Sequence, residues 1–194
     1  MIDLATVMHQ CAPGVAPSVL EAIIRTESGF DPLALHINGP MRLRSRPKTA
    51  AQAATWSSWL IRQGYSVDMG LMQINSRNLV ALDLTPEGAF DPCRNVRAGA
   101  ALLTTQYNRA KAAGSPGTPA LLQAISAYNT GSFQGGFRNG YVAKILMHDS
   151  AAGKVPMLDL TCLPTHCSPR PSGVHLSVLP YAADTAVGGF GASP

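Results

Sequence analysis

An acidic residue continues the apolar face of a helix near the start of this chain. Leu20, Ile23 and Ile24 have the spacing of side chains on one side of a helix, and Glu27 follows one turn later on that side. Burial of this face would raise the pKa of Glu27 toward neutrality, where a carboxyl group can act as a general acid. The competing interpretation is an ordinary glutamate that turns to solvent in the last turn. With either interpretation, a helix that is apolar on one face has to pack that face against a hydrophobic core, and a hydrophobic content of 46% is ample for such a core.

Apolar periodicity and boundary residues predict a mostly α fold (α+β) with a short β element. The segment 30–48 contains Gly, Pro and Asn, so we expect it to be irregular, with a short hairpin as its only regular structure. The predicted helices cover residues 3–10, 17–28, 49–63, about 75–82, 94–112, 118–128 and about 137–148.

The composition changes near residue 149. Pro, Gly and Ser recur beyond it and no helical period survives, apart from an extended segment considered at 174–179. We therefore expect a folded domain over 1–148 and a disordered tail over 149–194. No apolar run approaches the roughly 20 residues that a membrane-spanning helix needs, so no membrane span is expected.

The predicted domain is basic, with 13 Lys and Arg against 8 Asp and Glu. Such a surface favours an anionic partner, namely a nucleic acid, lipid headgroups or an acidic cell-wall polymer. The densest cluster is Arg42, Arg44, Arg46 and Lys48, for which a solvated loop is the alternative. Few aromatic residues surround it and no basic helix carries aromatic partners, so no nucleic acid is expected as a partner.

The four cysteines form two sets. Cys11 and Cys93 lie at the edges of predicted helices, and a disulfide between them would stabilise the fold by about 4.5 kcal/mol in the chain-entropy model. Such a pair would indicate an oxidising compartment. Cys162 and Cys167, with His166, supply too few ligands for a metal site, so no metal is expected and a tail disulfide or free thiols are favoured. No signal peptide is visible at Met1, which leaves the route to such a compartment open.

Six short motifs stand out along the chain. They are Cys11-Ala12-Pro13, Glu27-Ser28-Gly29, the run from Gly70 to Leu79, Asp91-Pro92-Cys93, Ala127 to Gly131, and Asn139-Gly140-Tyr141-Val142. In this order and at these separations, they resemble the lysozyme-like lytic transglycosylases, and most closely the VirB1-like members of type IV secretion and conjugation systems. The resemblance covers about residues 9–147.

The resemblance implies a lysozyme-like domain that cleaves peptidoglycan without a cofactor. Glu27 would be the sole catalytic acid and base, and cleavage between N-acetylmuramic acid and N-acetylglucosamine would leave a 1,6-anhydro ring. The implied partners are glycan strands and type IV secretion components, and the implied location is the periplasm or cell envelope. Residues implied to bind or support the substrate are Ser28, Gly70, Met72, Gln73, Tyr128, Asn129 and Tyr141.

Some of these residues have structural alternatives. A serine in the last turn of a helix commonly bonds to the backbone, so Ser28 has that alternative, and Met72 suits the core as well as a subsite. Gln73 offers a donor and an acceptor to sugar amides, and Gly70 permits close backbone approach. Asn129 would present an amide to the cleft.

The two tyrosines also have a structural alternative. The resemblance implies that Tyr141 would hold Glu27 by a hydrogen bond and that Tyr128 would place a ring on the cleft. Packing in the core with a satisfied hydroxyl is the competing role for both.

Two rival functions remain. Glycosidases usually pair two carboxylates about 5–10 Å apart, and Asp68 is the best candidate for a second one, which would make the protein a muramidase that uses water. The other rival is a scaffold without catalytic activity that binds glycan or secretion partners through its basic segment and tail.

Overall fold

The computed structural model describes residues 3–151 of the chain. The predicted tail, its extended segment at 174–179 and the cysteines at 162 and 167 lie outside the described residues. Within them the architecture is mostly helical with a small sheet, as predicted. The α-helices are α1 (Leu4–Cys11), α2 (Pro17–Ser28), α3 (Ala50–Arg62), α4 (Pro92–Ala112), α5 (Gly117–Thr130), α6 (Gly135–Arg138) and α7 (Tyr141–Ala151).

Side chains that cap helix ends explain where several of these helices begin and stop. Asp3, Thr49 and Asp91 each accept a hydrogen bond from a backbone N–H in the first turn of α1, α3 and α4. Gly29 and Gly131 end α2 and α5 in the left-handed conformation, which glycine adopts without a steric penalty. The end of α2 at Gly29 confirms the predicted boundary.

The prediction of a helix over about 75–82 is wrong. The chain forms two 3-10 helices there, η1 (Ser76–Asn78) and η2 (Val80–Leu82), and a third, η3 (Gly88–Phe90), follows. Asn75 accepts a hydrogen bond from the Arg77 N–H at 3.0 Å and tightens the first turn. Leu79 is buried but Val80 is 94% exposed, so no continuous apolar face is buried that would stabilise an α-helix.

The helix expected over 137–148 is two helices. Gly140 has a φ of 80°, a conformation that interrupts the helical path between α6 and α7. The Asn139 side chain accepts a hydrogen bond from the Tyr141 N–H at 3.0 Å, so the break also starts α7.

The sheet is antiparallel and has three strands, in the order β1 (Leu35–Ile37), β2 (Val67–Met69), β3 (Ile74–Asn75). The hairpin expected within the described segment 30–48 does not form, so that prediction is wrong. The strand β1 pairs instead with β2, which follows α3 in the sequence. The strand pairing therefore brings together two segments that are about 30 residues apart along the chain.

Alternation along the strands gives the sheet a polar face and an apolar face. His36 lies opposite Asp68, and Asp68 lies opposite Asn75, so these three side chains share one face. Met69 and Ile74 lie in the next row, face the other way and are fully buried. A register slip of one residue would exchange the two faces, so burial of the apolar row fixes the polar row in place.

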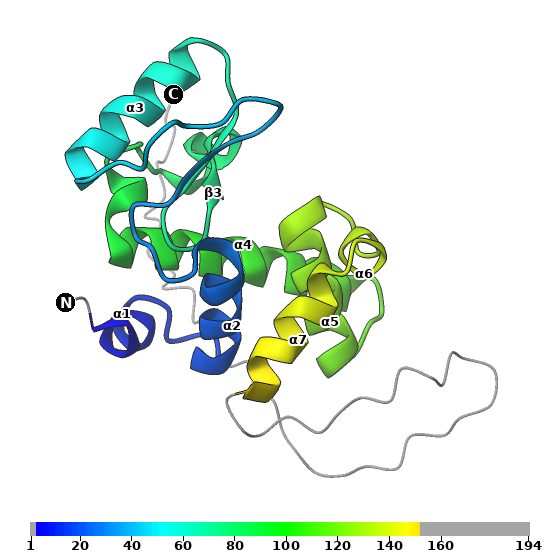
Figure 1. Cartoon of the computed structure of the whole chain (residues 1–194). Coiled ribbons are helices and arrows are strands. Elements are labelled where there is room, and N and C mark those ends of the chain that lie inside the picture. Colours follow the sequence, from blue (N-terminus) through cyan, green and yellow to red (C-terminus); the bar gives the residue numbers. More distant parts are fainter. Residues whose placement is uncertain (1–2, 152–194) are drawn as a thin grey trace, which may run out of the picture.

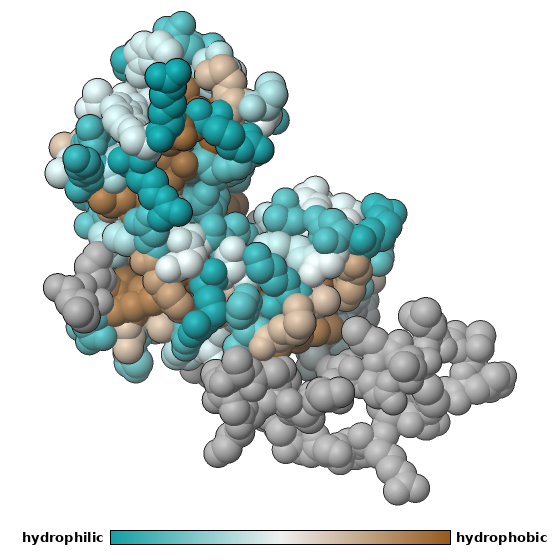
Figure 2. Space-filling view, viewed as in Figure 1, coloured by the Kyte–Doolittle hydropathy of each residue, from teal (hydrophilic) through white to brown (hydrophobic). Residues whose placement is uncertain are grey.

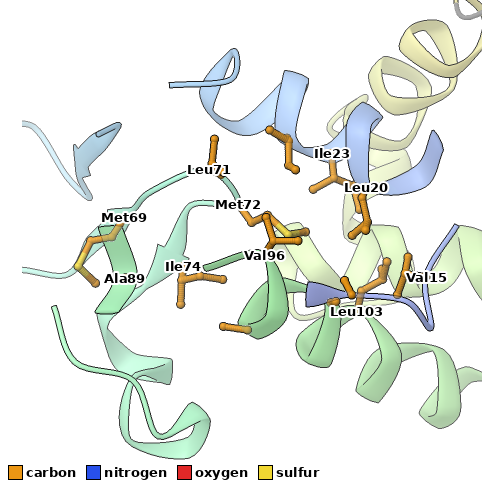
Figure 3. Packing of buried hydrophobic residues seen from close by; sticks show 14 of the residues in the cluster. Val15, Leu20, Ile23, Met69, Leu71, Met72, Ile74, Ala89, Val96 and Leu103 are labelled. Atoms are coloured by element: carbon orange, nitrogen blue, oxygen red, sulfur yellow. The ribbon is translucent and has the colours of Figure 1, made fainter. Parts of the chain in front are cut away.

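The core lies between α2, α4 and the turn after β2. Leu20, Ile23 and Ile24 are completely buried, which confirms that this face of α2 is apolar and internal. Figure 3 shows Met72 next to Val96 of α4, on the side of the core that faces Leu20 and Ile23 of α2. In Figure 1, α4 crosses the middle of the molecule, with α3 and the sheet on one side of it and α5, α6 and α7 on the other.

The predicted disulfide between Cys11 and Cys93 is present. It joins the last residue of α1 to the first turn of α4, with the two Cα atoms 5.4 Å apart. Of the helices that the structure describes, none has both the length and the apolar character to cross a bilayer.

Candidate active site

Two adjoining cavities meet at Glu27 and form one cleft. One has a volume of about 740 Å³ and the other about 530 Å³, and Glu27, His36 and Gln73 line both. The larger half extends over the polar face of the sheet toward Tyr128 and Asn129, and the smaller half lies under the loop that precedes α3. Figure 2 shows this face of the molecule hollowed between the lobe of α3 and the lobe of α5 and α6.

Glu27 is half-buried at the last turn of α2, and its environment favours the protonated form. Burial is the main cause that raises the pKa of Glu27, to about 7, and the negative charge of Asp68 adds to it. The Tyr141 hydroxyl donates a hydrogen bond to Oε1 at 2.5 Å and acts in the opposite direction, as does the positive charge of Lys144. Near neutral pH this carboxyl group can therefore both give up and accept a proton.

Two tyrosines, Tyr128 of α5 and Tyr141 of α7, lie within the electrostatic influence of this carboxyl group. Burial and the negative charge of Glu27 raise the pKa values of Tyr128 and Tyr141 well above their usual range, so both stay protonated and act as donors. Tyr141 donates to Glu27, whereas Tyr128 donates to the Met72 carbonyl at 2.7 Å. Thus Tyr141 orients the carboxyl group, and Tyr128 ties α5 to the turn beside it.

Asp68 lies on the polar face of the sheet in the same cleft. Its two carboxylate oxygens accept hydrogen bonds from the side-chain amides of Asn38, at 2.9 Å, and Asn75, at 2.6 Å. These three residues and Glu27 line the larger half of the cleft. The structure thus brings a second carboxylate to the site, held in a network of amide donors.

A buried asparagine fixes the turn that follows β2. Asn95 of α4 is 1% exposed, and its Oδ1 accepts from the Met72 N–H at 2.8 Å. Its Nδ2 donates to the carbonyls of Met69, at 2.9 Å, and Ala89, at 2.7 Å. Gly70, with a φ of 73°, packs so closely that an added Cβ would lie 2.3 Å from both the Ala89 oxygen and Asn95 Nδ2. The close approach at Gly70 is therefore to the protein interior.

Gln73 completes the turn and faces both halves of the cleft. Its backbone adopts the left-handed region with a φ of 46°. Its Nε2 donates to the carbonyls of Ala34, at 3.1 Å, and Gly70, at 2.9 Å. These bonds join the turn to the segment before β1 and fix the direction of the side chain.

The remaining predicted residues are placed as follows. The Ser28 hydroxyl donates to the Ile24 carbonyl at 3.1 Å, the backbone bond that was its alternative, while the residue also lines the smaller half of the cleft. The Met72 side chain is completely buried, so it packs in the core rather than lining a subsite. Asn129 lines the larger half, and its Oδ1 accepts from Asn139 Nδ2 at 2.9 Å.

Three residues that matter for the site were not identified from the sequence. His36 is exposed and lines both halves, Asn38 bonds to Asp68, and buried Asn95 holds the turn. The alternation of Leu35-His36-Ile37 is the signal that could have placed His36 on a polar strand face. Among the described side chains, no group of three His, Cys, Asp or Glu residues lies close enough to hold a metal ion.

Comparison with known proteins agrees with the motifs. The family model described as "Transglycosylase SLT domain" matches residues 6–144. "Protein virB1" of Agrobacterium fabrum is 46% identical over 137 residues, which cover 71% of this chain and 55% of that protein. "Protein virB1" of Rhizobium radiobacter is 41% identical over 78% of this chain and 62% of its own length. "Type IV secretion system protein virB1" of Brucella abortus is 36% identical over 83% of this chain and 71% of its own length.

The matches cover most of this chain but less of its relatives. The chain spans a little over half the length of the first two relatives, so the similarity concerns only that part of them. No solved structure shows significant similarity to the chain. Because the family model covers most of the folded region, the chain belongs to the transglycosylase SLT domain family.

Proposed function

We propose that this protein is a peptidoglycan lytic transglycosylase with Glu27 as its only catalytic acid and base. The observation that carries the proposal is the position of Glu27 at the junction of the cleft, with its pKa raised to about 7 by burial. The substrate is the β-1,4 bond between N-acetylmuramic acid and N-acetylglucosamine. Membership of the SLT family supports this choice of substrate.

In the first step, protonated Glu27 donates its proton to the glycosidic oxygen, and the bond from that oxygen to C1 of the muramyl sugar breaks. The positive charge that develops at C1 is met by the sugar's own 2-acetamido group. In the second step, the C6 hydroxyl oxygen of the muramyl sugar forms a bond to C1, and the Glu27 carboxylate accepts the proton of that hydroxyl. The products are a 1,6-anhydro sugar and a new glycan end, no water is consumed, and Glu27 returns to its protonated form.

The neighbours of Glu27 suit this cycle. The Tyr141 hydroxyl keeps one carboxyl oxygen in place and stabilises the charged form that the second step requires. Gln73 and Asn129 line the cleft with amides that can bond to the N-acetyl groups of the glycan. Ser28 and Tyr128 line opposite halves and shape the approach to Glu27, and Gly70 and Met72 support the turn from below.

The experiment is digestion of purified peptidoglycan, with mass spectrometry of the products. The wild-type protein should release 1,6-anhydromuropeptides, and Glu27→Gln should release none while keeping its far-UV circular dichroism and its melting temperature near pH 5. Gln preserves the shape and an acceptor for Tyr141 but cannot donate a proton as an acid. A normal yield of anhydro products from the folded variant would contradict the proposal.

A muramidase is the second candidate, because Asp68 lies in the same cleft as Glu27. In that reaction Asp68 would assist a water molecule, and the new reducing end would be heavier than the anhydro end by one water. The same mass spectra separate the two reactions. A binding scaffold without catalytic activity would instead retain peptidoglycan without forming either product.

A cellular setting follows from the relatives' names. The virB1 relatives include a protein named for type IV secretion, so we infer that this chain opens the cell wall locally for such a system in the cell envelope. The disulfide between Cys11 and Cys93 suits an oxidising compartment such as the periplasm. Deletion of the gene should reduce transfer by the secretion system, and complementation with the Glu27→Gln form should fail to restore it.

A further inference from the structure

The smaller half of the cleft is lined by a basic loop that the proposed reaction does not use. The arginine loop, residues 38–48, carries Arg42, Arg44 and Arg46, and all three line this half. Pro47 is buried and Leu43 is half-buried against the core, so the apolar side chains anchor the loop. In Figure 2, strongly hydrophilic side chains spread across the lobe that carries this loop.

The three arginines differ in what holds them. Arg42 Nη1 donates to the carbonyls of Gly39, at 2.6 Å, and Met41, at 2.8 Å, so its guanidinium closes the loop on itself. Arg46 Nη1 lies 3.8 Å from the Asp31 carboxylate and its side chain is 90% exposed, so this ion pair is weak. Among the described residues, no hydrogen bond or ion pair holds the exposed Arg44 side chain. Arg44 and Arg46 therefore keep their donors available to a ligand.

The charge of this half favours an anion. Its lining includes three arginines against the carboxyl groups of Glu27 and Asp31. Glu27 is partly protonated near neutral pH, because its pKa is raised to about 7, so fewer than two negative charges face three cations. The guanidinium group matches a carboxylate with two parallel hydrogen bonds, which an ammonium group cannot do.

We infer that the arginine loop is a subsite for the carboxylates of the peptide that peptidoglycan carries on its muramyl residues. The inference rests on the proposed function, because a glycan strand bound across Glu27 places a muramyl residue, and the acidic peptide on its lactyl group, beside the cleavage point. The muramyl sugars are uncharged as long as their lactyl carboxyl groups form the amide bonds to the peptide, so in an intact strand the peptide is the part that the loop can recognise by charge. The subsite would make the protein select peptide-bearing strands over bare ones.

The test compares two substrates and three variants of the full chain. Initial rates are measured on glycan strands with intact peptides and on bare strands, whose peptides have been removed by an amidase and whose lactyl carboxyl groups, set free by that cleavage, have been converted to amides. The Arg44→Gln/Arg46→Gln protein should lose about three- to tenfold in kcat/KM on the peptide-bearing strands and remain unchanged on bare strands. Lys111→Gln and Arg62→Gln remove exposed cations that line neither half of the cleft, and should leave both rates unchanged.

A substitution of opposite sign sharpens the test. The Asp31 carboxylate competes with a ligand for Arg46, and Asp31→Asn removes this negative charge. In the wild-type protein Asp31 Oδ1 accepts a hydrogen bond from the Leu33 N–H at 2.9 Å, and the asparagine oxygen can accept the same bond. The preference for peptide-bearing strands should rise in this variant, by less than about threefold because the pair is exposed. Added salt should reduce the wild-type preference, since exposed charges are screened.

Binding measurements separate failure of this inference from failure of the proposed function. The Glu27→Gln protein is titrated with disaccharide peptides that carry free carboxyl groups and with the same peptides converted to amides. Tighter binding of the free carboxylates, lost in the Arg44→Gln/Arg46→Gln background, supports the subsite even if no cleavage is found. Equal binding of both peptides, or equal cleavage of bare and peptide-bearing strands by the wild-type protein, overturns it while leaving the transglycosylase proposal standing.

Discussion

The two halves of the cleft share Glu27 but are built in different ways. The amide half, which includes Asn38, Asn75 and Asn129, lies on the sheet and α5, and its side chains bond to one another or to neighbouring elements. The arginine half is lined by an exposed loop, in which Arg42 bonds to the loop's own backbone, Arg46 has only a weak ion pair, and Arg44 has no partner among the described residues. A surface whose donors are already oriented suits uncharged sugars, whereas exposed charges on a loop suit a flexible anionic substituent.

The difference is also one of support from below. The amide half rests on the turn that Asn95 and Gly70 hold against α4. The arginine half is anchored by Pro47 and Leu43 and by the self-bonding of Arg42. We therefore expect substitutions beneath the first half to change the stability of the whole domain, and those in the second to act locally.

The largest effect is expected for Asn95→Ala, which breaks the support of the amide half. The substitution removes all three hydrogen bonds that Asn95 makes, to the Met72 N–H and to the carbonyls of Met69 and Ala89. We expect the free energy of unfolding to fall by at least about 3 kcal/mol, measured by urea denaturation. Asn108→Ala, at an exposed site on the same helix, should change it by less than about 0.5 kcal/mol. Similar losses for both variants would refute the difference between the halves.

The next largest effect is expected at Glu27, where the two halves of the cleft meet. It is measured as the free energy of unfolding of the wild-type protein and of Glu27→Gln over a range of pH. The pKa of Glu27 is raised from 4.5 to about 7 in the folded protein, so the folded state binds the proton more tightly than the unfolded state. The wild-type protein should therefore lose stability as pH rises through this window, by at most about 3 kcal/mol. Glu27→Gln has no such proton, so its advantage over wild type should be absent near pH 4 and complete above pH 8. Parallel stability curves would show that Glu27 is not desolvated.

A smaller effect is expected on the pH profile of kcat/KM when one neighbour of Glu27, Asp68 or Tyr141, is substituted. Asp68 raises the pKa of Glu27 and the Tyr141 hydrogen bond lowers it. Asp68→Asn should shift the alkaline limb to lower pH, and Tyr141→Phe should shift it to higher pH, each by about one unit or less. Asp83→Asn, at an exposed turn outside the cleft, is the control and should leave the limb in place. Shifts of the same sign in both cleft variants would contradict the assigned causes.

The smallest effect is expected for Arg42→Gln in the arginine half. Its two hydrogen bonds lie on an exposed loop, so their loss should cost less than about 1 kcal/mol of unfolding free energy. Hydrogen exchange should become faster in 38–48 but not in β2 or β3. A uniform increase across the sheet would show that the loop and the sheet are not independent.

Features that depend on nearby residues were predictable from the sequence. The apolar face of α2, its end at Gly29 and the left-handed caps follow from local periodicity and from glycine's freedom at positive φ. The order of six motifs also indicated the family that the comparison shows. The pairing of Cys11 with Cys93 was predicted because both lie at helix ends.

Predictions failed where long-range packing decides local structure. The run over 75–82 has the composition of a helix, but its side chains are not buried along one face. The expected hairpin in 30–48 was replaced by pairing between β1 and β2 across α3. The same pairing placed Asp68 and His36 in the cleft, which sequence spacing alone does not reveal.

By itself, the sequence determined that a carboxyl group would end an apolar helix face, because helical periodicity is a local property of the chain. It also determined that a basic segment would follow that helix. The bond from the Tyr141 hydroxyl to Glu27, across 114 residues of sequence, was implied by the family resemblance but forms only in the tertiary structure, which alone decided that the arginines line the same cleft. Burial and the approach of distant groups set the pKa of this carboxyl group, and both arise only when the elements pack together.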